Sequence, residues 1–273
     1  MNIYILVPVF NNLNLTKLFL ESVRGMKNLR IIIIDDNPSK LHKSLDDYEN
    51  IDLVFGDGTN YWGGSINLGI SYLESRYFLN DSDLIIIANN DIIIDFKLKN
   101  LVNSKLDFQN SVYHVQVRDE KLNYIKSCGR IKSWFPFIQE YPRGFKEKFK
   151  EVDTLTGRFL LLTWLQLKSV GGIDSKLPHY GGDSDLGLKL KSKNYKSYLL
   201  RDFSCVVNKE QTGLFENARI NQLISLLTDI KSSFCVRYKW VFVRNHNNYL
   251  FSLLIIISIY LKLIVIIVKN HLK

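Results

Sequence analysis

Four short, predominantly apolar runs occur in the first third of this chain, and Arg30 and Asp52 are the polar residues inside them. They show no alternation of polar and apolar positions, which is typical of strands in a parallel sheet covered on both faces. Between them, apolar residues recur every three or four positions over 15–26 and 66–77, which predicts helices. The pattern therefore predicts an α/β fold with a mostly parallel central sheet and helices on both faces. The predicted strands span 3–9, 30–34, 51–55 and 84–88.

Polar clusters follow three of these strands at the point where each strand ends. They are Asn11–Asn12, Asp35–Asp36 and Asn89–Asn90–Asp91. In open α/β sheets ligands bind at the carboxyl ends of the strands, so these clusters predict one shared binding site. The acids of the second cluster can accept hydrogen bonds from nucleotide ring N–H groups or ribose hydroxyls. The alternative is that they only build the turn before Pro38.

The third cluster interrupts an otherwise apolar stretch, between Ile85–Ile87 and Ile92–Ile94. Polar groups at such a place are costly unless the strand ends there at a cleft. One carboxylate and one amide make a poor metal cage on their own. They suit a divalent ion that also takes oxygens from a diphosphate.

A glycine-rich loop at 56–64 precedes the second predicted helix. It lacks the spacing of the known phosphate-binding motifs, so a phosphate cradle and a flexible loop both remain open. Its aromatic residues, Tyr61 and Trp62, can stack on a ligand ring or anchor the loop. We favour anchoring.

A tight turn at Pro178–Leu186 delivers two carboxylates, Asp183 and Asp185, to the start of a further predicted helix. Acids are favourable at a helix N-terminus because the unpaired amides and the helix dipole attract negative charge. Stabilisation of the helix N-terminus is by itself enough to explain both acids. The alternative is a carboxylate aimed into the cleft that the strand-end clusters predict.

The C-terminal segment is almost wholly apolar from Leu250 to Val268, which is long enough to span a bilayer. About fifteen Leu, Ile, Val and Phe residues, at roughly −0.3 to −0.6 kcal/mol each, outweigh Lys262 at about +2.5 to +3.5 kcal/mol. We expect this segment to attach the protein to a membrane. It can either span the bilayer or lie in the membrane, and the sequence does not choose between the two. The alternative is a buried core helix or an oligomer interface.

Composition narrows the possible partners. The net charge of +9 suits acidic lipid, phosphorylated ligands or nucleic acid. Nucleic acid does not explain the acids at the strand ends, and no helix carries a dense basic stripe, so we expect no nucleic-acid partner. The three cysteines lack metal-type spacing, which favours reduced thiols in the cytosol. The apolar N-terminus has no basic region before it and is a strand, not a signal peptide.

The order of these motifs resembles the family 2 glycosyltransferases with the GT-A fold, over about residues 1–210. The relatives that look most similar are bacterial enzymes that build O-antigen, capsule or other surface polysaccharides. The motifs are Val7–Asn11, Ile34–Asn37, Asn60–Gly69, Asn89–Asp91, Thr156–Leu160, Val170–Asp174 and Pro178–Leu186.

The resemblance implies a role for each matching residue. Asp183 would be the catalytic base, and Asp91 would bind Mg²⁺ or Mn²⁺ that bridges the diphosphate. Gly182 stands where the family usually has a Glu beside the base, and Asn208 stands near a position where many members have a metal-binding His. The expected donor-binding residues are Pro8, Asn11, Asp35, Asp36, Asn67, Asn90 and Arg158.

The expected protein is thus an inverting, metal-dependent glycosyltransferase at the cytoplasmic face of the cell membrane. It would move a hexosyl or deoxyhexosyl group from a nucleotide-diphosphate donor to a hydroxyl of a saccharide acceptor, with a lipid-linked saccharide as one form of that acceptor. The alternatives are a non-catalytic nucleotide-sugar-binding scaffold and a nucleotidyltransferase. We expect a transferase domain over 1–210, with a nucleotide-binding half of about 1–110, a basic helical linker over 211–249 and a membrane-associating tail over 250–273.

Overall fold

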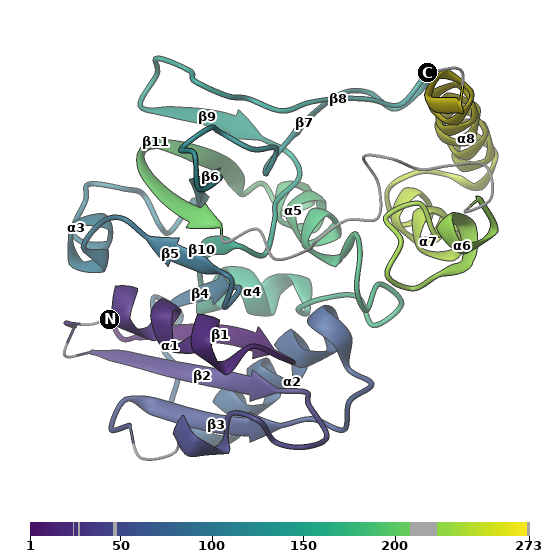
Figure 1. Ribbon diagram of the computed structural model, residues 1–273. Helices are drawn as coiled ribbons and strands as arrows, with labels where there is room; N and C mark the ends of the chain where they lie inside the picture. Colours follow the sequence, from purple (N-terminus) through teal and green to yellow (C-terminus); the bar gives the residue numbers. More distant parts are fainter. Residues whose placement is uncertain (24, 27, 46–47, 208–222, 272–273) are drawn as a thin grey trace.

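The computed structural model describes residues 1–271 apart from 24, 27, 46–47 and 208–222 (Figure 1). The described part consists of a central sheet with helices on both faces and a group of C-terminal helices beside it. Asn208, which the sequence resemblance singled out, lies outside the described residues.

The central sheet has nine strands, of which eight follow the order β3-β2-β1-β4-β10-β6-β11-β5, and β9 pairs with β11. The four strands from β3 to β4 run parallel. Beyond them the sheet is mixed, because β10 runs antiparallel to both β4 and β6. The strands are β1 Ile3–Val9, β2 Leu29–Asp35, β3 Ile51–Phe55, β4 Leu84–Ala88, β5 Ile92–Ile94, β6 Ser111–Arg118, β9 Phe149–Val152, β10 Phe159–Thr163 and β11 Lys196–Val207.

The parallel strands read as continuous apolar runs because both faces of the sheet are buried. Alternate residues of β1 enter two different cores: Ile5 and Val7 face one, and Leu6 faces the other. Helices α1 and α3 cover the first face, and α2, α4 and α5 cover the second. These helices are α1 Leu13–Ser22, α2 Tyr61–Arg76, α3 Leu98–Val102, α4 Trp164–Val170 and α5 Gly182–Ser192, with a short 3₁₀ helix at Lys43–Leu45.

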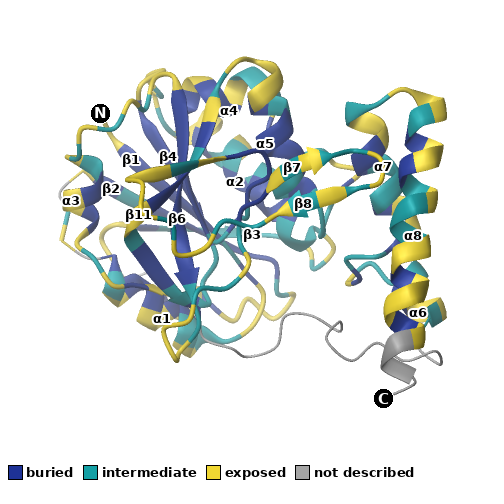
Figure 2. Cartoon of the chain, turned by 90° about the horizontal axis from the view of Figure 1, so that it is seen from above, coloured by how far each residue is buried: buried dark blue, intermediate teal, exposed yellow. Residues whose placement is uncertain are grey.

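A second, two-stranded sheet projects from the body as the hairpin β7 Arg130–Ser133 and β8 Ile138–Glu140. Its tip reaches toward the C-terminal helices, and Trp134 and Phe137 pack with Phe242 of that group. The hairpin joins the sheet to the C-terminal helices (Figures 1 and 2).

The segment expected as a basic linker over 211–249 contains packed helices in its described part. They are α6 Leu223–Thr228 and α7 Val236–His246, followed by α8 Tyr249–His271. Tyr238, Phe242 and Val243 of α7 form a core with Leu177 and Leu188, on and just before α5. Helix α7, which lies in the segment expected as a linker, is thus packed against α5 and contributes to the site described below.

Candidate active site

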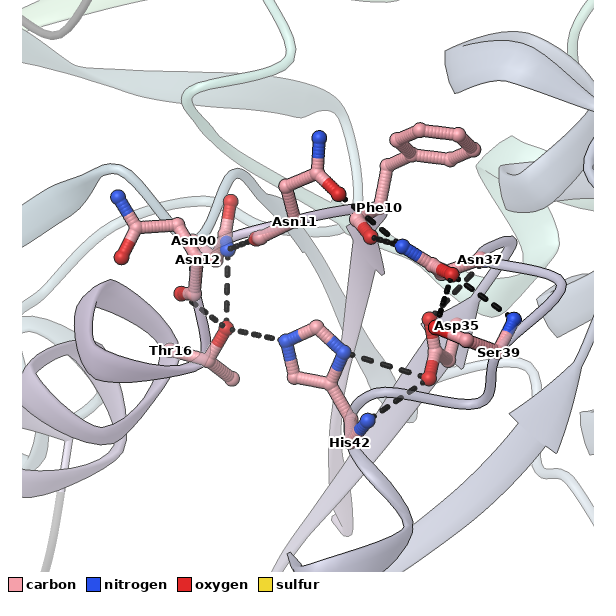
Figure 3. A network of polar contacts seen from close by, with 9 residues as sticks. All are labelled: Phe10, Asn11, Asn12, Thr16, Asp35, Asn37, Ser39, His42 and Asn90. Atoms are coloured by element: carbon pink, nitrogen blue, oxygen red, sulfur yellow. Dashed lines mark hydrogen bonds and ion pairs between the residues drawn. The ribbon is translucent and has the colours of Figure 1, made fainter.

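The ends of β1, β2 and β4 meet in a network of polar contacts (Figure 3). Asp35 is fully buried, and its carboxylate accepts hydrogen bonds from the backbone N–H groups of Asn37 and His42 at 3.0 and 2.9 Å. The His42 ring lies between Asp35 and Thr16, with Nδ1 3.3 Å from the carboxylate and Nε2 3.0 Å from the hydroxyl. Asn90 donates to the same hydroxyl at 2.9 Å. The network thus ties three strand ends together.

The His42 ring is neutral at neutral pH. Burial lowers its pKa, and the nearby Asp35 carboxylate only partly opposes this effect. A neutral ring with its proton on Nδ1 faces the carboxylate with a donor and leaves Nε2 to accept from Thr16. Asp35 is therefore committed to internal contacts and holds the loop after β2 in place.

Asp36 is the centre of the glycine-rich loop. Its carboxylate accepts from the backbone of Gly58 at 2.9 Å, from the Asn60 amide at 2.8 Å and from the backbone of Tyr61 at 3.1 Å. A side chain at Gly56 would overlap the same carboxylate, with its Cβ 2.2 Å from Oδ1. The loop wraps around this acid, which fixes the start of α2.

The rim of this region is exposed. Asn37 donates to the Phe10 carbonyl at 2.6 Å and to Asn11 Oδ1 at 3.0 Å, so the loops after β1 and β2 are held together. The aromatic ring of Phe10 is 49% exposed beside Asn11. Pro8 lies one residue before the end of β1, paired with Ile34.

Asn67 is the expected donor-binding residue that the structure does not bring to this cluster. Its amide makes a two-point contact with the backbone of Ile173, donating at 2.8 Å and accepting at 2.9 Å. It lines a cavity of about 300 Å³ between α2 and α4. In this conformation Asn67 fixes the loop before α5.

Asp91, Arg158 and Asp183 form an electrostatically coupled group. Burial raises the pKa of both carboxyls, and the Arg158 guanidinium opposes the rise at each of them. The backbone N–H groups of Ser184 and Gly157 donate to Asp183 at 2.8 and 3.2 Å and hold its carboxylate in place. The structure thus brings the expected metal ligand, the expected base and a cation into one region.

The Asp91 carboxylate fits a cation site in one respect. Its Oδ1 is buried and has no hydrogen-bond partner among the described residues. No group of three or more His, Cys, Asp or Glu side chains that could hold a metal occurs in the part of the chain that the structure describes. A single carboxylate with a free oxygen suits an ion whose remaining ligands come from a diphosphate and water.

Trp62, in the first turn of α2, contacts the segment after β4 and the segment before β10. Its indole N–H donates to Asn89 Oδ1 at 2.9 Å. A Cβ at Gly157 would lie 2.0 Å from the indole ring, so only glycine fits there. A Cβ at Gly182 would lie 2.7 Å from Ile173 Cγ2 and 3.0 Å from the Leu177 carbonyl. The position of the family's Glu is therefore filled by the loop before α5.

Asp185 does not cap α5. The carboxylate is fully buried and accepts from Asn245 and His246 at 2.9 Å each, while Lys189 lies at 2.8 Å. Burial acts to raise the pKa of this carboxyl, but the bonds from His246, Lys189 and Asn245 outweigh it and leave the pKa lowered. Asp185 thus fastens the end of α7 to α5.

A cavity of about 200 Å³ opens beside Asp183. Helix α7 forms one of its walls, which reasoning from the sequence did not predict. The spacing of Tyr238 and Phe242 indicates an apolar helix face that has to pack somewhere, but not where. Among the lining residues are Asp183, Tyr141, Tyr180, Tyr238, Lys239 and Phe242.

Two solved structures show which fold the chain has. GalNAc-T7, solved with UDP, GalNAc and Mn²⁺, superposes with a TM-score of 0.58 and 12% identity, over 76% of this chain and 44% of that chain. TarS of S. aureus superposes with a TM-score of 0.53 and 12% identity, over 91% of this chain and 44% of that chain. The chain therefore has the GT-A fold that we expected, and it spans less than half the length of these two proteins.

The sequence of the chain identifies its family. The family model of Glycosyl transferase family 2 matches residues 4–162, more than half of the chain, so the protein belongs to this family. Rhamnosyltransferase WbbL of Escherichia coli (strain K12) is 24% identical over 221 residues, which are 75% of this chain and 82% of the relative. The chain is therefore a family 2 glycosyltransferase.

Proposed function

We propose that the chain is an inverting enzyme that transfers a sugar from a nucleotide-diphosphate donor to a hydroxyl of a saccharide in surface-polysaccharide synthesis. The observation that carries the proposal is the position of Asp183, which lines a cavity of about 200 Å³. The Arg158 guanidinium acts to lower the pKa of both Asp183 and Asp91. The acceptor would occupy the cavity. The donor would lie along the strand ends, near Pro8, Asn11 and Asn90, on the loops that Asp35 and Asp36 hold in place.

In the proposed reaction, the acceptor oxygen attacks the anomeric carbon opposite the diphosphate. The new C–O bond forms as the bond to the diphosphate oxygen breaks, and the configuration inverts. Asp183 takes the proton of the attacking hydroxyl, and the nucleoside diphosphate leaves with the electron pair. Because burial raises the pKa of Asp183, its conjugate carboxylate is a stronger base than an exposed aspartate.

Asp91 is the residue that would hold a Mg²⁺ or Mn²⁺ ion, which supplies positive charge to the departing diphosphate. Arg158 would contribute a second positive charge from the protein itself. GalNAc-T7 was solved with UDP and Mn²⁺, which supports this combination for a chain of the same fold.

The relative named as a rhamnosyltransferase supports a deoxyhexose as one donor sugar to test. The assay is transfer from a panel of nucleotide-activated hexoses and deoxyhexoses with Mn²⁺ present. Asp183→Asn should lower turnover by about 10²–10⁴-fold while donor binding remains. Glu147→Gln, an exposed acid changed in the same way, is the control. Normal turnover by Asp183→Asn would refute the assignment of the base.

A non-catalytic sugar-nucleotide-binding protein is the rival, because Gly182 leaves one carboxylate where the family usually has two. Donor binding without transfer or hydrolysis across the whole panel would favour it. Membership of a glycosyltransferase family argues against a nucleotidyltransferase.

We also propose that the protein works at the cytoplasmic face of the cell membrane, on a lipid-linked acceptor. Helix α8 supports this, since Tyr249–Val268 is long and apolar enough to cross a membrane and only 22% of its most apolar window is buried. Flotation of the full chain with lipid vesicles tests the attachment. A chain that stays in the soluble fraction at low and high salt would refute it.

A further inference from the structure

Helix α7 lies outside the region that matches the family model, yet it forms one wall of the cavity at Asp183. Tyr238, Lys239 and Phe242 come from this helix, and Asp183 and Ser184 come from α5 opposite. The position of α7 is fixed at its C-terminal end, where Asn245 and His246 bind Asp185. Helix α5 thus presents one acid to the cavity and uses the other to hold the cavity wall.

Lys239 is the one lysine or arginine among the described residues that line this cavity, as Asp183 is the one acid. Its ammonium group is partly buried and has no ion-pair partner within 4.0 Å among the described side chains. The remaining lining groups are hydroxyls, an amide, aromatic rings and backbone. A partly buried cation with neutral neighbours is costly until an anion pairs with it.

The Asp183 carboxylate attracts the Lys239 ammonium group only at long range. Burial lowers the pKa of Lys239, and the Asp183 carboxylate opposes this without an ion pair between the two. The space between them is the cavity itself. At about 200 Å³ it is smaller than pockets that enclose a whole ligand, roughly 300–1,000 Å³, so it holds one end of a larger molecule.

We propose that Lys239 binds an anionic group of the acceptor, a phosphate or a carboxylate, close to the hydroxyl that Asp183 deprotonates. The proposal rests on the proposed function, because it takes the cavity as the acceptor site. The anion pairs with Lys239 and so places the neutral hydroxyl, rather than the charged group, against the Asp183 carboxylate. A neutral acceptor leaves Lys239 unpaired and binds more weakly.

The test compares the full-length protein with Lys239→Met and Lys239→Arg on three acceptors: a sugar 1-phosphate, the corresponding uronic acid and the neutral methyl glycoside. Lys239→Met should raise the KM of whichever anionic acceptor is used by about 10–100-fold, and Lys239→Arg should retain most of the affinity. Donor KM and slow donor hydrolysis should stay unchanged. Arg237→Met, an exposed cation on the same helix, is the matched control.

Three results would overturn the proposal. The first is a preference of the unchanged protein for the neutral acceptor, and the second is an equal loss on all three acceptors in Lys239→Met. The third is a shifted pH profile at constant acceptor KM, which would mean that Lys239 acts on Asp183 instead. Absence of both transfer and donor hydrolysis in the unchanged protein is a different result, since it refutes the proposed function itself.

A separate observation concerns how α8 meets a membrane. Ser252, Ile255, Leu263 and Ile267 are buried along one face of this helix, against α6, α7 and the β7–β8 hairpin. The contact continues along the helix: Ser258 Oγ accepts from the Phe137 backbone at 3.4 Å, and the Tyr260 hydroxyl donates to the Phe234 carbonyl at 2.8 Å. Helix α8 therefore lies beside α6 and α7 over the part from Ser252 to Ile267 (Figure 2).

The other face of α8 is an apolar stripe whose side chains are 45–74% exposed. Its residues recur every three or four positions, and the stripe runs for about 27 Å at 1.5 Å per residue. Lys262 is exposed on the same helix, and its long side chain can reach past the stripe to headgroups. The stripe consists of Leu250, Leu254, Ile257, Leu261, Ile264 and Val268.

We infer that α8 lies in the plane of the membrane surface, with this stripe in the acyl-chain boundary of a bilayer that contains anionic lipid. A spanning α8 would carry α6, α7 and their flanking charges, such as Lys231 and Arg237, into the hydrocarbon layer. Both of these cations are exposed, and together with the net charge of +9 they favour anionic headgroups. The inference rests on the proposed membrane attachment.

Nitroxide labels on single introduced cysteines at positions 250, 257 and 264 test the orientation in vesicles of phosphatidylglycerol and phosphatidylcholine. The three native cysteines are buried, which protects them from labelling. An in-plane helix gives one shallow depth at all three positions. A depth that is greatest at 257 and decreases to either side would mean a spanning helix and overturn the inference.

Substitution of the stripe gives a second measurement. Ile257→Asp with Leu261→Asp should abolish flotation with vesicles, whereas Phe78→Asp, an exposed apolar residue on the loop after α2, should not. Unchanged flotation, or a stripe that is buried in a dimer of the free protein by light scattering, would contradict the inference.

Discussion

The hydrogen bonds from Asn245 and His246 of α7 to Asp185 of α5 give the most specific prediction. Asp185→Asn replaces a fully buried carboxylate that accepts from Asn245 and His246 and lies 2.8 Å from Lys189. Breaking a buried ion pair by removing one partner costs about 3–5 kcal/mol. Asparagine keeps one acceptor oxygen at nearly the same place, so we expect a loss of about 2–3 kcal/mol in the free energy of unfolding. For a chain of this size that corresponds to roughly 5–10 °C in Tm.

The effect should depend on pH in one direction. The folded-state pKa of Asp185 is lowered, so its contribution is fully present above the unfolded value of about 3.9 and is lost as the pH falls through the folded value. The difference in Tm between the unchanged protein and Asp185→Asn should therefore be complete at pH 7 and shrink below about pH 4. Thermal unfolding followed by circular dichroism measures it.

Asp183→Asn is the matched control, since it makes the same change two residues earlier on the same helix. Burial raises the pKa of Asp183, so the charged form of this group destabilises the folded state as the pH rises through that pKa. The control should unfold at the same temperature as the unchanged protein or higher at pH 7. Equal Tm losses in the two variants, or a loss in Asp185→Asn that does not change with pH, would refute the reasoning.

Three further predictions follow from the site. Gly182→Glu restores the residue usual in the family, but its Cβ would meet Ile173 and the Leu177 carbonyl. It should therefore lower the free energy of unfolding by about 1–3 kcal/mol. A stable variant with higher turnover would contradict this. Trp62→Phe loses the bond to Asn89 and should lower kcat more than it changes donor KM, which steady-state kinetics separates. Asp91→Asn should weaken Mn²⁺-dependent donor binding in calorimetry and leave metal-free binding unchanged; equal binding with and without Mn²⁺ in the unchanged protein would contradict the metal role.

The parallel half of the sheet could be predicted from sequence because burial on both faces leaves a simple signature. Strands such as Ile3–Val9 and Leu84–Ala88 need apolar residues at every position, and such runs are visible without any knowledge of their neighbours. The direction of a strand has no such signature. Phe159–Thr163 is equally apolar, yet it runs antiparallel to its neighbours because of the path of the chain before it.

The convergence of the polar strand ends could be predicted from the sequence, but the hydrogen-bond partners of their side chains could not. The location of the site followed from polar residues at the strand ends. The orientation of each side chain depends on partners outside its own turn. The backbone N–H groups of His42 and Gly58 donate to the carboxylates of Asp35 and Asp36. The Asn67 amide donates to the carbonyl of Ile173, which is 106 positions away. Such partners leave no local pattern in the sequence.

The wall of the cavity was the least predictable part. Lys239 reaches the site because Asp185 binds residues about 60 positions further along the chain. Loop spacing and periodicity describe neighbours within a few residues, so a basic helical segment after the last strand looks like a linker until its packing is known.

The β7–β8 hairpin contacts both the cavity and helix α8. Phe137 and Gln139 line the cavity at Asp183, and the backbone of Phe137 also bonds to Ser258 of α8. Binding equilibria that share a structural element are reciprocal: if contact at the outer face of α8 alters the affinity of the cavity, filling the cavity alters the affinity of α8 by the same factor. If α8 binds a lipid surface as inferred above, a ligand in the cavity and that surface would change each other's affinity through this hairpin.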